Sequence, residues 1–201
     1  MKEGGSADAS RRTRRAGVGL GLLLAMLLPP SRHAAEASMT AHMLVQYVGL
    51  LLAGCLVVEG LPGRWLRRLQ RWNELGIAGL AGSALALAVL MVPRVLDLAL
   101  VDMRVESLKL SALVLCGAAL GLSWRRAGIV VQVFFLGNVL AMTAVVGILY
   151  QDSGMRVCNA YLLDDQQNLG RALIWIAVGI ATVWLLCSGF RASPHGASTR
   201  A

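Results

Sequence analysis

The chain has 201 residues, of which 57% are apolar and 15% are charged, and its mean hydropathy is +0.65. Ordinary soluble domains carry about 25% charged residues, so this composition excludes a soluble globular protein. The formal net charge of +8 comes from short arginine clusters beside apolar stretches, a pattern typical of membrane-flanking loops and not of a nucleic-acid surface.

The dominant feature of the chain is a series of apolar stretches of membrane-spanning length. They lie at 41–60, 75–92, 107–124, 128–149 and 172–190. We therefore predict an all-α, multi-pass transmembrane bundle of five helices, preceded by a signal peptide or a short sixth helix. The expected divisions are an N-terminal segment at 1–37, the bundle at 38–192 and a polar cytoplasmic tail at 193–201.

The N-terminal segment allows two interpretations. A basic start is followed by a 13-residue apolar run at 16–28 and by the small-residue motif Ala35-Glu36-Ala37. This order fits a signal peptide cleaved before Ser38, and the run is shorter than the ~17 to 25 residues of a normal span. The alternative is a retained first transmembrane helix, and both interpretations place residue 38 on the outer side.

The arginine clusters predict the orientation. They occur at 11–15, 64–71 and 125–126, which alternate with less basic loops along the chain. Positively charged loops stay in the cytoplasm, so we expect both ends of the chain to be cytoplasmic. Almost all of the 19 basic residues are arginine, as in GC-rich bacteria, and the expected location is the bacterial inner membrane.

Soft side chains gather near the outer membrane surface. Met39, His42, Met43 and Gln46 fall within about 100° of one another on a helix, and Cys158 is the one cysteine placed in an outer loop. Thioether, thiolate and imidazole together select Cu(I), so His42, Met43, Met39 and Cys158 are the predicted metal ligands. The plainer interpretation is that methionine fills core gaps and that a lone histidine bonds water or backbone.

Other polar and small residues suggest packing. Gly79 and Ser83, and likewise Gly117 and Gly121, have the four-residue spacing that allows close helix approach, either within the bundle or in a homo-oligomer. Asn138 lies near the bilayer midplane, where we expect it to form an interhelical hydrogen bond, with a ligand or ion path as the alternative.

Two outer segments are harder to assign. Residues 92–104 are mixed in character and are predicted to form an outer loop or an interfacial turn. The loop at 151–167 ends with Asp164 and Gln167, whose spacing predicts that Asp164 caps the last helix.

The stretch from Met39 to Tyr47 (MTAHMLVQY), which leads into an apolar helix and then Gly60-Leu61-Pro62, resembles the opening of CtaG-type cytochrome c oxidase assembly factors. In that family an HMxxQH-like sequence starts an early helix. Here Gln46 and Tyr47 stand where a second histidine is expected, and the chain is at least one helix shorter than a full member. The resemblance implies a role in assembling, or supplying copper to, a respiratory oxidase, with oxidase subunits as partners.

Catalytic motifs are absent from the sequence. It has no Walker motif, dinucleotide glycine fingerprint, His-Glu-x-x-His pair or CxxC motif, so we expect no enzyme activity and no cofactor other than Cu(I). The predicted function is assistance to oxidase assembly or copper supply. The alternatives are an accessory structural subunit of a membrane complex and a small transporter.

Overall fold

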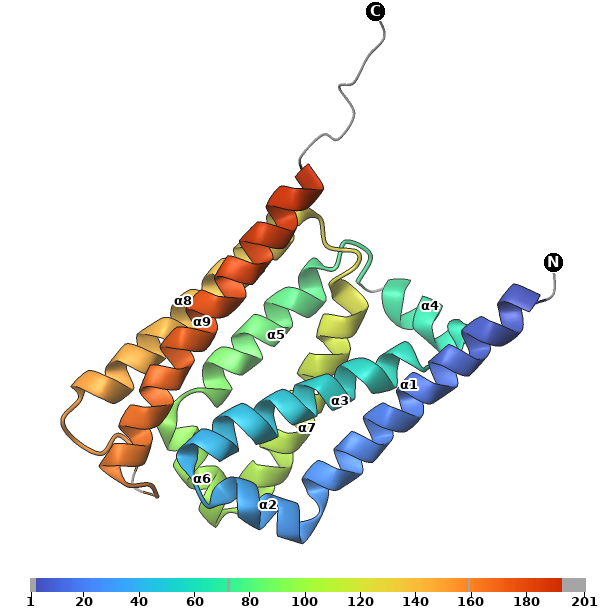
Figure 1. The fold of residues 1–201 in the computed structure, drawn as a ribbon. Helices are drawn as coiled ribbons and strands as arrows, with labels where there is room; N and C mark the ends of the chain where they lie inside the picture. Colours follow the sequence, from blue (N-terminus) through green and yellow to red (C-terminus); the bar gives the residue numbers. More distant parts are fainter. Residues whose placement is uncertain (1–2, 72, 159, 193–201) are drawn as a thin grey trace, which may run out of the picture.

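A computed structural model describes residues 3–71, 73–158 and 160–192, and every regular element within these ranges is helical (Figure 1). The predicted polar tail at 193–201 lies outside the described residues. In chain order the helices are α1 (Glu3–Leu27), α2 (Pro29–Glu36), η1 (Ala41–Gln46), α3 (Tyr47–Glu59), α4 (Gly63–Arg71), α5 (Ile77–Leu90), α6 (Pro93–Val101), α7 (Met103–Ser123), α8 (Ile129–Asp152) and α9 (Leu163–Ala192).

The helices have the length and composition of a multi-pass membrane protein, as predicted. Four segments are individually long and apolar enough to cross a bilayer: Ala41–Glu59, α7, α8 and Leu163–Ser188. Two bent pairs reach the same length, α1 with α2 at 67° and α5 with α6 at 72°, which gives up to six spans among the described residues.

The centre of the bundle is α3, which packs against α1 on one side and α7 on the other (Figure 1). Glycines allow the close approach on both sides. A Cβ atom added at Gly117 of α7 would collide with the backbone of Leu51, and one at Gly19 of α1 would lie 2.8 Å from the backbone nitrogen of Val57. Helices α8 and α9 form a separate pair beside α5.

The predicted packing role of the small residues is confirmed. Gly121 of α7 faces Cys55 of α3, and a Cβ added at Gly79 of α5 would meet Ser123 of α7. The Ser83 hydroxyl donates to the carbonyl oxygen of Cys116 across the α5–α7 contact at 3.4 Å. Both small-residue pairs are therefore used within the bundle.

Two predicted outer segments differ from the structure. Residues 92–104 are not a loop, because Pro93 occupies the first turn of the short helix α6 after an extended Val92. The last helix begins at Leu163, so Asp164 lies in its first turn and not at the capping position before it. The loop before α9 is instead organised by Gln166, whose Nε2 donates to the Tyr150 carbonyl oxygen at 3.2 Å.

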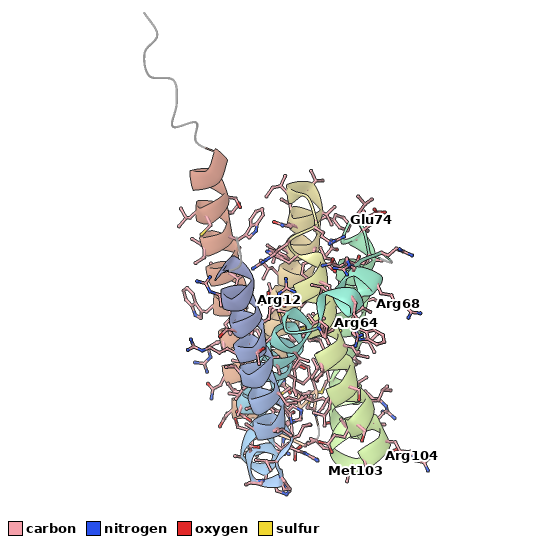
Figure 2. The ribbon with its side chains drawn as sticks, turned by 90° about the vertical axis from the view of Figure 1, so that its right-hand side faces the viewer. Arg12, Arg64, Arg68, Glu74, Met103 and Arg104 are labelled. Atoms are coloured by element: carbon pink, nitrogen blue, oxygen red, sulfur yellow. The ribbon has the colours of Figure 1, made fainter. Side chains whose placement is uncertain are left out.

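The two ends of the molecule differ. Helices α2 and α6 lie at one end and α4 lies at the other (Figure 1). Figure 2 shows Met103 and Arg104 at the first end, and Arg12, Arg64, Arg68 and Glu74 toward the second. We call the first the outer end, after the side on which the sequence analysis expects it, and the second the basic end.

Candidate functional site

The candidate site lies inside the outer end of the bundle. Residues 41–46 form a wide, π-type helical turn that runs directly into α3. Such turns occur often at functional sites, because the extra residue redirects neighbouring side chains. Here His42, Met43 and Gln46 all point into the protein and are buried.

A hydrogen-bonded chain joins the π-type turn, α7 and the loop before α9 at this place. His42 Nε2 lies 2.9 Å from Lys109 Nζ of α7, and His42 Nδ1 lies 3.0 Å from the Tyr161 hydroxyl. Lys109 Nζ also donates to Gln46 Oε1 at 3.3 Å. His42, Gln46 and Lys109 are at most 1% exposed, so the chain of bonds is shielded from solvent.

A buried ion pair lies one turn away from Lys109 on α7. Glu106 accepts from Arg32 of α2, with Oε2 and Nη2 2.5 Å apart, and its side chain is only 8% exposed. Arg32 also lies 3.7 Å from Glu36 of its own helix. Buried charges in a membrane bundle are costly unless they are paired, so this pair fixes α2 against α7.

Helix α9 is tied to the same end. The Asp165 carboxylate accepts from the backbone nitrogen of Met39 and from the Thr40 hydroxyl, the latter at 3.4 Å. Tyr161, just before α9, supplies the hydroxyl that contacts His42. Burial, followed by the nearby Glu36 carboxylate, raises the pKa of Tyr161, so this phenol stays neutral at physiological pH.

The four predicted metal ligands all lie in the interior of the protein. Met39, Met43 and Cys158 belong to one buried cluster, and the His42 ring lies against Tyr47 and Tyr161 of the same cluster. We expected these side chains to gather near the outer membrane surface, and the structure directs them into the bundle. Met103 and Met155, in contrast, are 70% and 75% exposed.

The arrangement restricts how His42 can bind a metal ion. An ammonium group only donates, so Lys109 assigns Nε2 as the acceptor and places the ring hydrogen on Nδ1, directed at Tyr161. Both ring nitrogens are then engaged. Copper can reach His42 only if Lys109 or Tyr161 moves, and the nearby cation opposes it electrostatically.

The sulfur atoms are less restricted. Burial, then the Asp97 carboxylate, raises the pKa of the Cys158 thiol to about 12. The thiol is therefore protonated at neutral pH, and a soft metal ion would have to displace the proton. Within the described residues no group of three or more His, Cys, Asp or Glu side chains is arranged around a metal position, so thioethers would have to contribute.

Sequence reasoning missed the charged partners in this site. Lys109 and Glu106 lie at the start of an apolar stretch, and Arg32 lies in the segment assigned to a signal peptide or a first transmembrane helix. An ionisable residue in a membrane-spanning stretch is a default sign of function, so Lys109 was the detectable signal. Its pairing with His42 could not be detected, because the two residues are 67 positions apart in the sequence.

Asn138, which suggested a transport path, and the other polar residues in or near the apolar stretches do not converge. Asn138 is exposed on the outside of α8 and donates to the Phe134 carbonyl oxygen of its own helix at 2.8 Å, so the expected interhelical bond is not formed. Gln132 bonds the Trp124 carbonyl oxygen at 2.9 Å. Glu59 lies at the basic end.

No protein-family model matches the chain, and no curated protein or solved structure matches it.

Proposed function

We propose that the chain is a non-enzymatic membrane protein that assists the assembly of a respiratory oxidase and handles Cu(I) as cargo at the outer end of its bundle. The observation that supports the copper chemistry is the gathering of Met39, His42, Met43 and Cys158 in one buried region. The client is suggested by the resemblance of residues 39–47 to CtaG-type assembly factors.

Copper is a transient ligand in this proposal. Met39, Met43 and Cys158 supply soft sulfur donors, and His42 joins them only when its bond to Lys109 opens. Exchangeable thioethers favour transfer to a client over permanent storage. A direct test is titration of the purified protein with Cu(I) against a competing chelator.

The expected result separates ligands from the blocking cation. The His42→Ala, Met43→Ala double variant loses most of the bound copper, whereas Lys109→Leu binds at least as tightly as the parent, because it removes a positive charge 2.9 Å from the imidazole without adding a sulfur ligand. Equal binding by parent and double variant, or no binding by either, refutes the copper site.

The client is tested in cells. Deletion of the gene should lower oxidase activity, and added copper should restore it. Loss that copper does not restore favours a structural role in the complex, and normal respiration refutes both.

The location proposed is the bacterial inner membrane, with the basic end and both chain ends in the cytoplasm. A periplasm-active reporter fused after Met39, near Asp102 or near Cys158 should be active. The same reporter should be inactive at Arg68 and Arg126, and activity at Arg68 overturns this topology.

An accessory structural subunit is the second candidate. A groove of about 360 Å³ runs between α5 and α8, lined by apolar side chains such as Leu80, Phe134 and Met142, with Asn138 as its polar wall residue. An amide facing lipid is unfavourable, so a transmembrane helix of a larger complex that bonds Asn138 would be stabilised there.

The transporter alternative has less support, because Asn138, Gln132 and Glu59 do not line a common path.

A further inference from the structure

Four arginines line a recess at the basic end of the bundle. The recess has a volume of about 180 Å³ and is bounded by α1, α3, α4 and the end of α7. Arg12 and Arg15 come from α1, and Arg125 and Arg126 follow α7. Among the described residues of this lining Glu59 is the single carboxylate, and it lies 2.7 Å from Arg15. The recess therefore keeps an excess of positive charge.

The recess also has an apolar wall. Val58 of α3, Leu66 of α4 and Leu122 of α7 line it beside the arginines. At its rim Arg126 donates to Gln70 of α4 at 2.8 Å. A free anion would contact only the guanidinium groups, whereas a phospholipid presents a phosphate and an acyl chain side by side. The mixed lining matches the lipid.

The position along the helices fits the phosphate layer of a membrane. Arg15 immediately precedes the apolar run of α1, and Arg125 lies two residues beyond the end of α7 at Ser123. The transition from apolar helix to charged end therefore passes through the recess. Lipid phosphates lie at this depth, between the hydrocarbon core and water.

Helix α4 marks the same layer. Its Trp65 and Leu69 are 50% and 42% exposed and lie on one side of the helix, with Arg64 and Arg68 flanking that side and Arg67 opposite to it. Figure 2 shows Arg64 and Arg68 on α4 and Arg12 on α1 toward the same end of the molecule. A short amphipathic helix with an exposed tryptophan is typical of the headgroup region.

We infer that this recess binds the phosphate headgroup of an anionic phospholipid, with one acyl chain along the apolar wall. Guanidinium groups bind phosphate oxygens in a bidentate fork, and basic pockets between transmembrane helices bind anionic headgroups. A headgroup with two phosphates suits four arginines better than one with a single phosphate. The inference does not depend on the copper proposal.

The experiment uses the full chain, purified in neutral detergent with phosphatidylcholine. Native mass spectrometry and thermal unfolding measure binding of phosphatidylglycerol, of diphosphatidylglycerol, and of inorganic phosphate as the free-anion arm. The test variant is Arg12→Gln/Arg125→Gln, which leaves the Arg15–Glu59 pair and the Arg126–Gln70 bond in place. The control is Arg64→Gln/Arg68→Gln, which removes the same charge from the same end outside the recess.

We expect the parent to bind diphosphatidylglycerol more tightly than phosphatidylglycerol and to prefer both to phosphatidylcholine. At about 1 kcal/mol per arginine, the test variant should bind the anionic lipid about 30-fold more weakly. The control variant should stay within about threefold of the parent. Circular dichroism establishes that both variants fold, and the single Arg12→Gln change provides a second test at an exposed side chain.

Three results overturn the inference. Equal losses in test and control variants would mean diffuse surface charge and no recess site. Equal stabilisation by inorganic phosphate would mean a free-anion site. Equal binding of phosphatidylcholine would mean that the arginines do not select the headgroup.

Discussion

The coupling free energy between changes at His42 and Lys109 is the most direct test of the buried chain of hydrogen bonds. Lys109→Met leaves two acceptors without their donor, His42 Nε2 at 2.9 Å and Gln46 Oε1 at 3.3 Å. Each such group costs about 1–3 kcal/mol, and relief of the buried cation offsets part of this loss. We expect the single variant to lose about 2 kcal/mol of unfolding free energy.

The double-mutant cycle isolates the pair from these side effects. Hydrogen bonds to charged groups contribute about 1.5–3 kcal/mol, while interhelical bonds in membranes average about 0.6 and reach about 1.7. We therefore expect Lys109→Met and His42→Phe to be coupled by about 1–2 kcal/mol, with the double variant less destabilised than the sum of the two singles.

The assay is reversible unfolding in mixed micelles, followed by circular dichroism. The control cycle pairs Lys109→Met with Asn73→Ala, because Asn73 bonds Ser123 at the opposite end of α7. Distant pairs should be additive within about 0.5 kcal/mol. If the effects of the His42 and Lys109 changes are as additive as those of the control pair, the two side chains do not interact in the membrane-embedded protein. That result would refute the buried chain of hydrogen bonds.

Three further predictions concern packing, the thiol and the last helix. Gly117→Val should cost at least 1–3 kcal/mol, because its side chain would enter the α3 backbone, whereas Gly137→Val, with open space around it, should be neutral by the same unfolding assay. Cys158, with its pKa raised to about 12, should react with maleimide at pH 8 about a thousandfold more slowly in the folded protein than in denaturant; equal rates would contradict its burial. Because its folded pKa exceeds the unfolded value of about 8.5, its contribution to stability should be complete below pH 8.5 and disappear as pH rises toward 12. Asp165→Ala should destabilise by about 1–3 kcal/mol in thermal shift and Asp164→Ala by less, since Asp165 accepts from the Met39 backbone nitrogen and the Thr40 hydroxyl; the reverse order would restore Asp164 as the cap.

The transmembrane helices were predictable because apolar length alone distinguishes them, and the bundle arises from that property. The bends were within reach of sequence reasoning as well. Pro29 and Pro93 each occupy the first turn of a short helix after an extended residue, which is the position where proline is favoured. Residues 92–104 were nevertheless predicted as a loop or an interfacial turn, because their mixed polarity hides the short helix α6.

For the site, the sequence predicts which residues share one helix face but not which residues of other helices they contact. The spacing of Met39, His42 and Met43 places them on one face, but spacing does not tell whether that face meets solvent or α7. The face meets α7, where Lys109 bonds His42. This pairing depends on how α3 and α7 cross, which the sequence does not reveal. Asn138 is the converse case: an interhelical bond was predicted, but its side chain is exposed and donates to the Phe134 carbonyl oxygen of its own helix.

The role of residues 1–37 follows from the Arg32–Glu106 pair. If α1 and α2 are part of the working bundle, Arg32→Leu should leave the Glu106 carboxylate buried without its partner and cost about 3–5 kcal/mol. Arg32→Leu/Glu106→Leu should recover most of that loss, because apolar pairs of similar volume replace buried ion pairs well. A chain that starts at Ser38 should be destabilised at least as much as the single variant, since it also uncovers the α3 face that packs on Gly19. If that shortened chain unfolds with the parent's free energy, and N-terminal sequencing of the membrane protein begins at Ser38, then residues 1–37 act as a cleaved signal and the pair has no role in the mature bundle.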